Sequence, residues 1–175
     1  LGIVMVSGQQ YIEDMERKYM TADATELVSK FKADIPTDEE IAKLSTAATR
    51  QTPEAASLTR SLVQSLAYCG TKFKHEIMYH VGRLQRFADN PCIGVYVCAL
   101  QMLKYCIRDK LYGIAWSRCD EESTLEYSEQ PEEVFVSVDS SWQVHDKSTR
   151  SRSTTGMVFF WRNGPVAVRS NGQRF

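Results

Sequence analysis

One aspartate in the C-terminal part of the sequence could carry out metal-dependent chemistry. Asp139 lies near the end of an apolar run, VFVSVDSSW, at residues 134–142. A carboxylate on a buried strand is costly unless a cation or hydrogen bonds compensate for its charge. Metal-dependent phosphodiester hydrolysis uses such carboxylates to hold Mg²⁺. The sequence leaves two alternatives open: Asp139 is a metal ligand, or it is a strand-end residue that faces water or a turn.

The histidines and cysteines give weaker evidence for a metal or catalytic site. His75 and His80 nearly form a zinc-protease helix motif, but they are five residues apart instead of four and would point in different directions from a helix. The five cysteines are odd in number and lack a CxxC pair. This pattern argues against a disulfide framework and a zinc site, and it predicts a reducing compartment, cytoplasmic or nuclear.

Charge is strongly segregated along a chain whose net charge is -1. Residues 58–118 carry 9 basic and 3 acidic groups, whereas residues 119–133 carry 7 acidic groups and no basic ones. A basic segment of this kind permits a local phosphate-binding face, although solvated helix faces would give the same composition. The candidates for phosphate contacts that do not read sequence are Arg83, Arg86, Lys104 and Arg108.

The elements that must position these residues are helices first and strands second. An initial strand, LGIVMVSG, is followed by a short amphipathic helix with Ile12, Met15 and Tyr19 on one face. Residues 21–36 lack clear periodicity and predict irregular chain. Thr37 and Glu40 have the spacing of a capping box and predict a helix start.

Apolar stripes predict further helices between residues 57 and 108. The first carries Leu58, Leu62 and Leu66, and a break at Gly70 to Lys74 precedes a second with Ile77, Val81 and Leu84, which Asn90-Pro91 ends. A third is expected over Ile93–Arg108, with its apolar stripe at Val95, Ala99, Met102 and Cys106.

The pattern changes after an acidic connector at residues 119–133. Alternation over 134–139 predicts a strand, a second β-rich run covers 156–161, and Asn163-Gly164 predicts a hairpin turn into a returning strand at 165–168. The expected fold class is therefore α+β, a helical region followed by a three-stranded antiparallel meander.

Several segments resemble a known family. TRSLVQSLAY (59–68), VGRLQRFADNP (81–91) and LKYC (103–106) resemble the polymerase region of copia-type retrotransposon Pol polyproteins. VSVDSSWQVHDKSTRSRSTTGMVFFWRNGPVAV (136–168) resembles the opening strands of that family's RNase H domain. The resemblance implies a thumb/connection-like end of a reverse transcriptase at 1–118, an acidic linker at 119–132, and a truncated RNase H-like domain at 133–175.

The resemblance also implies a function. The chain would help to hold a primer–template or RNA–DNA hybrid, with Asp139 as the first catalytic Mg²⁺ ligand and the remainder of the Pol polyprotein as a partner, without a membrane. Both ends look cut, and the other catalytic carboxylates would lie outside 1–175, so we expect the chain to be a fragment that is inactive alone. The alternative is a non-enzymatic helical binding or scaffold module derived from a decayed or captured transposon.

Overall fold

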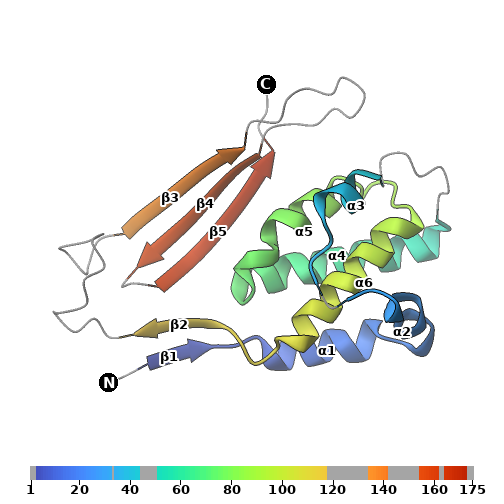
Figure 1. Ribbon diagram of the computed structural model, residues 1–175, viewed down its shortest axis with the longest axis horizontal. Coiled ribbons are helices and arrows are strands. Elements are labelled where there is room, and N and C mark those ends of the chain that lie inside the picture. The colour runs from blue at the N-terminus through green and yellow to red at the C-terminus, as the bar shows by residue number, and fades with distance from the viewer. Residues whose placement is uncertain are drawn as a thin grey trace. The chain divides into compact units, whose positions relative to one another are not determined.

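The protein combines helices and strands in two compact units, and this confirms the general α+β class (Figure 1). The helical unit comprises Gly8–Tyr112, and the strand unit comprises Leu1–Ser7 with Gly113–Phe175. The computed structural model describes residues 3–32, 34–43, 51–117, 134–141, 154–161 and 164–172.

The described elements follow the expected order of helices before a meander. The helices are α1 (Gln9–Tyr19), α2 (Ala22–Ser29), α3 (Asp38–Lys43), α4 (Pro53–Lys72), the 3-10 turn η2 (His75–Ile77), α5 (Met78–Gln85) and α6 (Ile93–Arg108). The strands are β1 (Ile3–Val6), β2 (Ile114–Ser117), β3 (Val134–Ser141), β4 (Thr154–Trp161) and β5 (Gly164–Gly172).

Helix α1 confirms its predicted buried stripe, whereas helix α2 was not predicted. In α1, the predicted stripe of Ile12, Met15 and Tyr19 is buried. The prediction of irregular chain over residues 21–36 is wrong, because α2 occupies most of its first half. The side chain of Thr21 accepts a hydrogen bond from the backbone N–H of Ala24 at 3.3 Å, so a cap starts this short helix.

The capping box at α3 is confirmed. The backbone N–H of Thr37 donates to the Glu40 carboxylate at 2.7 Å, and the backbone N–H of Glu40 donates to the Thr37 hydroxyl at 3.3 Å. Two backbone donors at the helix start are thereby satisfied. The cap places Asp38 in the first turn of α3, where it meets residues of α5.

The long helices α4 and α6 form the centre of the helical unit. Helix α6 has the predicted bounds, and its predicted stripe is buried. Helix α4 runs past the predicted break at Gly70 and ends at Lys72. Gly70 lets the following segment approach closely, since a Cβ there would lie 2.7 Å from the sulfur of Met78.

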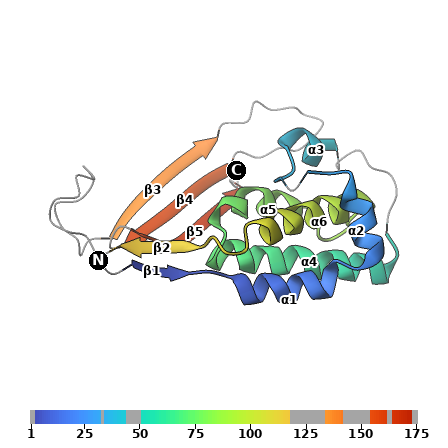
Figure 2. The ribbon, with the colours of Figure 1, turned by 60° about the horizontal axis from the view of Figure 1, so that its bottom comes forward.

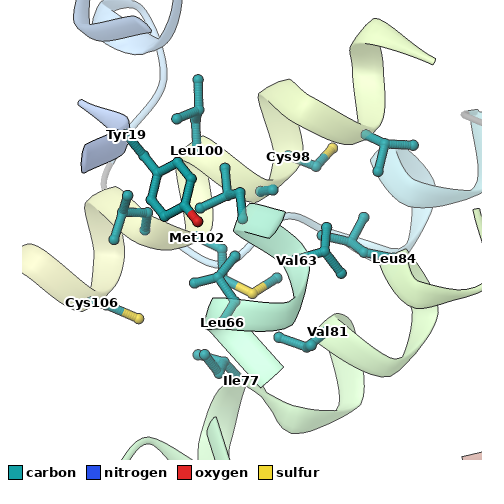
Figure 3. Packing of buried hydrophobic residues seen from close by; sticks show 14 of the residues in the cluster. Tyr19, Val63, Leu66, Ile77, Val81, Leu84, Cys98, Leu100, Met102 and Cys106 are labelled. Carbon is teal, nitrogen blue, oxygen red and sulfur yellow. The ribbon is translucent and has the colours of Figure 1, made fainter. Parts of the chain in front are cut away.

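One hydrophobic core joins these helices. Figures 1 and 2 show α1, α4 and α6 lying against one another. Figure 3 shows the side chains that meet between them, including Tyr19 from α1, Leu66 from α4 and Met102 from α6, all of which are buried. Burial of such side chains is the main stabilising contribution to the unit.

The strands form two antiparallel sheets. In the smaller sheet β1 pairs with β2, a strand that the sequence did not predict, with Ile3 opposite Ser117 and Val6 opposite Ile114. In the larger sheet the order β3-β4-β5 confirms the predicted meander. Asn163 of the predicted hairpin turn and the acidic connector at 119–133 lie outside the described residues.

The predicted division into 1–118, 119–132 and 133–175 stays a prediction. Within the described ranges, none of the helices has the length and apolarity needed to cross a membrane.

Candidate functional site

The predicted metal ligand, Asp139, lies in the C-terminal half of β3. Asp139 is the register partner of Gly156 on β4. Its side chain lies outside what the structure describes, so its role as a catalytic residue and Mg²⁺ ligand stays a prediction. Among the described side chains, no group of three or more histidine, cysteine or acidic residues is placed to hold a metal ion.

Arg83, a predicted phosphate contact, is drawn into a cluster between α5 and α3. It forms an ion pair with Asp38, and its side chain is only 15% exposed. Asp38 also accepts a hydrogen bond from the Tyr79 hydroxyl at 3.2 Å and lies 3.9 Å from the Nε2 atom of His80. The guanidinium of Arg83 therefore neutralises a carboxylate of its own chain.

Two further predicted phosphate contacts also make internal interactions. The ammonium of Lys104 donates to the backbone carbonyls of Val28 at 3.2 Å and Phe31 at 2.7 Å, and so ties α6 to the end of α2. Arg108 pairs with Asp109 at 2.6 Å and with Asp34 at 3.2 Å, and the hydrogen bonds to Asp109 raise the pKa of its guanidinium.

The fourth predicted contact, Arg86, is the C-cap residue of α5 and is exposed. The structure thus uses Arg83, Lys104 and Arg108 to hold the helical unit together, which accounts for their basic charge without a phosphate ligand. Binding to nucleic acid stays a prediction from composition, and the geometry adds no support to it.

The described cysteines are structural in position. Cys69, Cys92, Cys98 and Cys106 are free and buried, while Cys119 lies outside the described ranges. Burial raises the pKa of the Cys98 thiol to about 11. A thiol with a raised pKa holds little of the thiolate form that acts as a nucleophile, so Cys98 is unsuited to covalent catalysis at neutral pH.

Two half-buried histidines, His75 and His80, predict that the stability of the fold falls in mild acid. Burial lowers the pKa of His75, although the Thr71 carbonyl and Glu76 oppose this shift. Burial also lowers the pKa of His80, which Asp38 opposes and Arg83 reinforces. The unfolded chain, whose histidines titrate near 6.5, therefore binds more protons than the folded chain below that pH. The contribution of the two histidines to the free energy of unfolding is fully present above about pH 6.5. It is lost as the pH falls through 6.5 toward the lower pKa values of the folded chain.

Urea unfolding at pH 7.5 and 5.5 checks this expectation. The midpoint should be lower at pH 5.5, and the difference should shrink in a His75→Gln, His80→Gln double variant, which retains His145. An equal difference in both proteins would assign the acid sensitivity to other groups.

A different site emerges from aromatic residues on α1 and α4. The ring of Tyr11 lies 4.9 Å from that of Tyr68 and 6.1 Å from that of Phe73, and the last two rings are 6.2 Å apart. Tyr68 is 50% exposed, whereas Tyr11 and Phe73 are half-buried. We call Tyr11, Tyr68 and Phe73 the aromatic surface.

The backbone holds the aromatic surface in place. The hydroxyl of Tyr11 donates to the carbonyl of Ser65 at 3.2 Å, and the N–H of Phe73 donates to the carbonyl of Cys69 at 2.8 Å at the end of α4. A side chain on Gly8 would clash with the ring of Phe73, with its Cβ at 2.5 Å. Tyr11 and Phe73 are thus held against the elements that carry them.

The aromatic surface could not be predicted from the sequence because its three residues come from separate segments. One available signal was Tyr68, which lies off the buried stripe of Leu62, Leu66 and Cys69 on α4. A single exposed aromatic residue is common on protein surfaces, so Tyr68 by itself could not identify the aromatic surface.

Comparison with known proteins gives one relevant similarity. The chain is 28% identical over 114 residues, 65% of its length and 72% of the relative's, to "Secreted RxLR effector protein 161" of Plasmopara viticola. No family model matches the chain. No solved structure matches it either.

The secreted relative contradicts the family resemblance. The assignments to a copia-type retrotransposon Pol polyprotein, to a reverse transcriptase and to RNase H are wrong. For the helical segments of the resemblance, the physical reason lies in residues such as Leu62, Leu66, Val81 and Leu84, which are buried in the core. Any helix packed on a core needs apolar residues at such spacing, so the pattern identifies a structural role and no particular family.

The cytoplasmic or nuclear location expected from the cysteines is contradicted by the same secreted relative. The cysteine argument failed because the four described thiols are all buried. A thiol that lies inside a core is shielded from oxidants, and its free state therefore says little about the compartment. The similarity that remains is to a secreted effector.

Proposed function

We propose that this protein is a secreted, non-enzymatic binding module that acts through its aromatic surface on a protein partner. The observation that supports the proposal is the contact of Tyr11, Tyr68 and Phe73 at the outside of the helical unit. Secretion is proposed from the similarity to a secreted effector.

Aromatic residues suit a protein interface for a physical reason. Tyrosine offers a large apolar area together with a hydroxyl, and aromatic residues are enriched at the centres of interfaces, where they contribute most of the affinity. Rings that are already held in place lose little conformational entropy on binding. The hydrogen bond from Tyr11 to Ser65 and the packing of Phe73 beside Gly8 provide this order before any partner arrives.

The other side chains that could carry chemistry support a binding role. Arg83 and Arg108 are paired with carboxylates, Lys104 with backbone carbonyls, and the described cysteines are buried. These groups stabilise the unit that carries the aromatic surface. A stable scaffold with an exposed aromatic cluster fits recognition better than catalysis.

The test of binding starts from a photo-reactive phenylalanine analogue placed at position 68, which identifies a partner by crosslinking. Calorimetry then compares the affinity of that partner for the unchanged chain and for two variants. Tyr68→Ala should weaken binding tenfold or more, since central aromatic residues contribute roughly 2 kcal/mol or more to an interface.

The matched control is Gln64→Ala, which alters an exposed residue one turn earlier on α4. It should leave the affinity unchanged. Equal affinity of the Tyr68→Ala variant and the unchanged chain would refute the role of the aromatic surface. Secretion is tested separately: an antibody against residues 8–112 should detect the chain outside intact source cells, and its confinement to the cell lysate would contradict the proposal.

A further inference from the structure

Exposed lysines flank the aromatic surface in both directions along α4. Figure 2 shows α1 lying along this helix, and the ring of Tyr11 meets that of Tyr68 between them. Lys18 lies about two turns later on α1 and donates to the hydroxyl of Ser61, about two turns before Tyr68 on α4, at 3.3 Å. Lys72 lies on the other side, in the last turn of α4, where its spacing from Tyr68 places both on one helix face.

The two lysines present their charge to solvent. Lys18 and Lys72 are exposed, and among the described side chains no carboxylate forms an ion pair with either of them. Asp14 lies about one turn before Lys18 on α1, but it pairs with Arg17. The aromatic surface is therefore bordered by positive charge that the described part of the chain leaves without an acidic partner.

Helix geometry gives the spacing of these cations. Ser61, which holds Lys18, precedes Lys72 by 11 residues on α4. A rise of about 1.5 Å per residue corresponds to roughly 16 Å along the helix axis, with Tyr68 in between. An extended peptide covers this length with about five residues, since each adds roughly 3.3 Å.

We propose that the aromatic surface binds an acidic peptide segment of its protein partner. An apolar or aromatic side chain of that segment packs on Tyr68, and carboxylates on either side of it pair with Lys18 and Lys72. The rings contribute most of the affinity, whereas the charges at the rim select the partner and speed its association. A basic segment would meet like charge at both lysines and would bind more weakly.

This inference rests on the proposed function and adds the chemistry of the partner. The probe is a random library of short peptides, which is selected for binding to the whole chain. Enriched peptides should carry an acidic residue on each side of an apolar or aromatic one. A neutral or basic set of enriched peptides, or the absence of any enriched peptide, would overturn the inference.

Calorimetry with the most enriched peptide tests the two lysines. Lys18→Gln and Lys72→Gln should each weaken binding roughly two- to fivefold, the effect of losing an exposed ion pair. Lys72→Arg keeps the charge and should retain the affinity. The matched control is Lys32→Gln, which removes one exposed positive charge in the segment after α2 and should leave binding unchanged. Added salt should weaken binding to the unchanged chain, because it screens exposed charges.

Tyr68→Ala separates a failure of this inference from a failure of the proposed function. If this variant loses affinity while Lys18→Gln and Lys72→Gln bind as tightly as the unchanged chain, the aromatic surface is the binding site but its partner is not selected by charge. If the enriched peptides bind the Tyr68→Ala variant as tightly as the unchanged chain, the proposed function fails as well.

Discussion

Replacing Leu66 by alanine is expected to lower the free energy of unfolding of the helical unit by roughly 2–5 kcal/mol. Leu66 on α4 is fully buried, and Figure 3 shows it in the middle of the core. Removal of its outer carbons loses apolar burial and leaves a cavity that the surrounding helices fill only in part. Urea unfolding followed by far-UV circular dichroism measures the change.

The control for this experiment lies on the same helix. Leu58 is 42% exposed, so its replacement by alanine removes little buried apolar area. Alanine also has good helix propensity. Leu58→Ala should therefore change the free energy of unfolding by no more than about 0.5 kcal/mol. If both variants lost the same stability, helix propensity and not core packing would determine the result.

Tyr19→Ala should destabilise the helical unit by roughly 3–5 kcal/mol, the range for removing a buried aromatic ring. Tyr19 ends α1 and is 1% exposed. Its hydroxyl lies 2.8 Å from the Ser61 hydroxyl and 3.1 Å from the Ser65 hydroxyl, so the side chain joins α1 to α4 through its ring and its oxygen.

Tyr19→Phe separates these two contributions. It keeps the ring and should cost roughly 0.5–1.5 kcal/mol, the net value of a typical hydrogen bond. Both variants can be compared by the same urea titration, with an unchanged slope as evidence that the unfolded state is the same. An equal loss in the two variants would mean that the hydroxyl contacts, and not the ring, hold α1 in place.

Local patterns predicted those parts of the fold that depend on neighbouring residues. The burial of Val95, Ala99 and Met102 on α6 follows from helical spacing, and the Thr37–Glu40 box follows from the needs of a helix start. The meander follows from the alternation over 134–139, the β-rich run over 156–161 and the turn signal at Asn163-Gly164. These features are encoded within a few turns of helix or a single hairpin.

Most of the features that were not predicted depend on distant residues. Strand β2 has four residues and exists by pairing with β1, which precedes the helices in the sequence, whereas β2 follows them. Helix α2 was missed because its eight residues show little periodicity and its Thr21 cap was overlooked. The aromatic surface likewise requires Tyr11 to meet Tyr68, a contact that no local pattern contains.

The predicted phosphate-binding residues also depend on contacts that are distant in sequence. Composition identified Arg83 and Arg108 as cations, but their acidic partners are distant in sequence, since Asp38 begins α3 and Asp34 precedes it. A cation that has a carboxylate partner in the fold offers less charge to a ligand. Net charge along the sequence therefore overestimated the basic character of this segment.

The pairing of β1 with β2 determines how the molecule would respond to a mechanical pull. Ile3 and Ser117 form the pair farthest along the sequence from the helices, and Val6 and Ile114 form the pair nearest to them in sequence. A force applied to the chain before Ile3 and after Ser117 would separate the two strands one pair at a time, beginning with the pair of Ile3 and Ser117. Because the pairs break in succession and never share the load, this ribbon yields at low force, and the tension passes to α1 and α6 only after Val6 and Ile114 have parted.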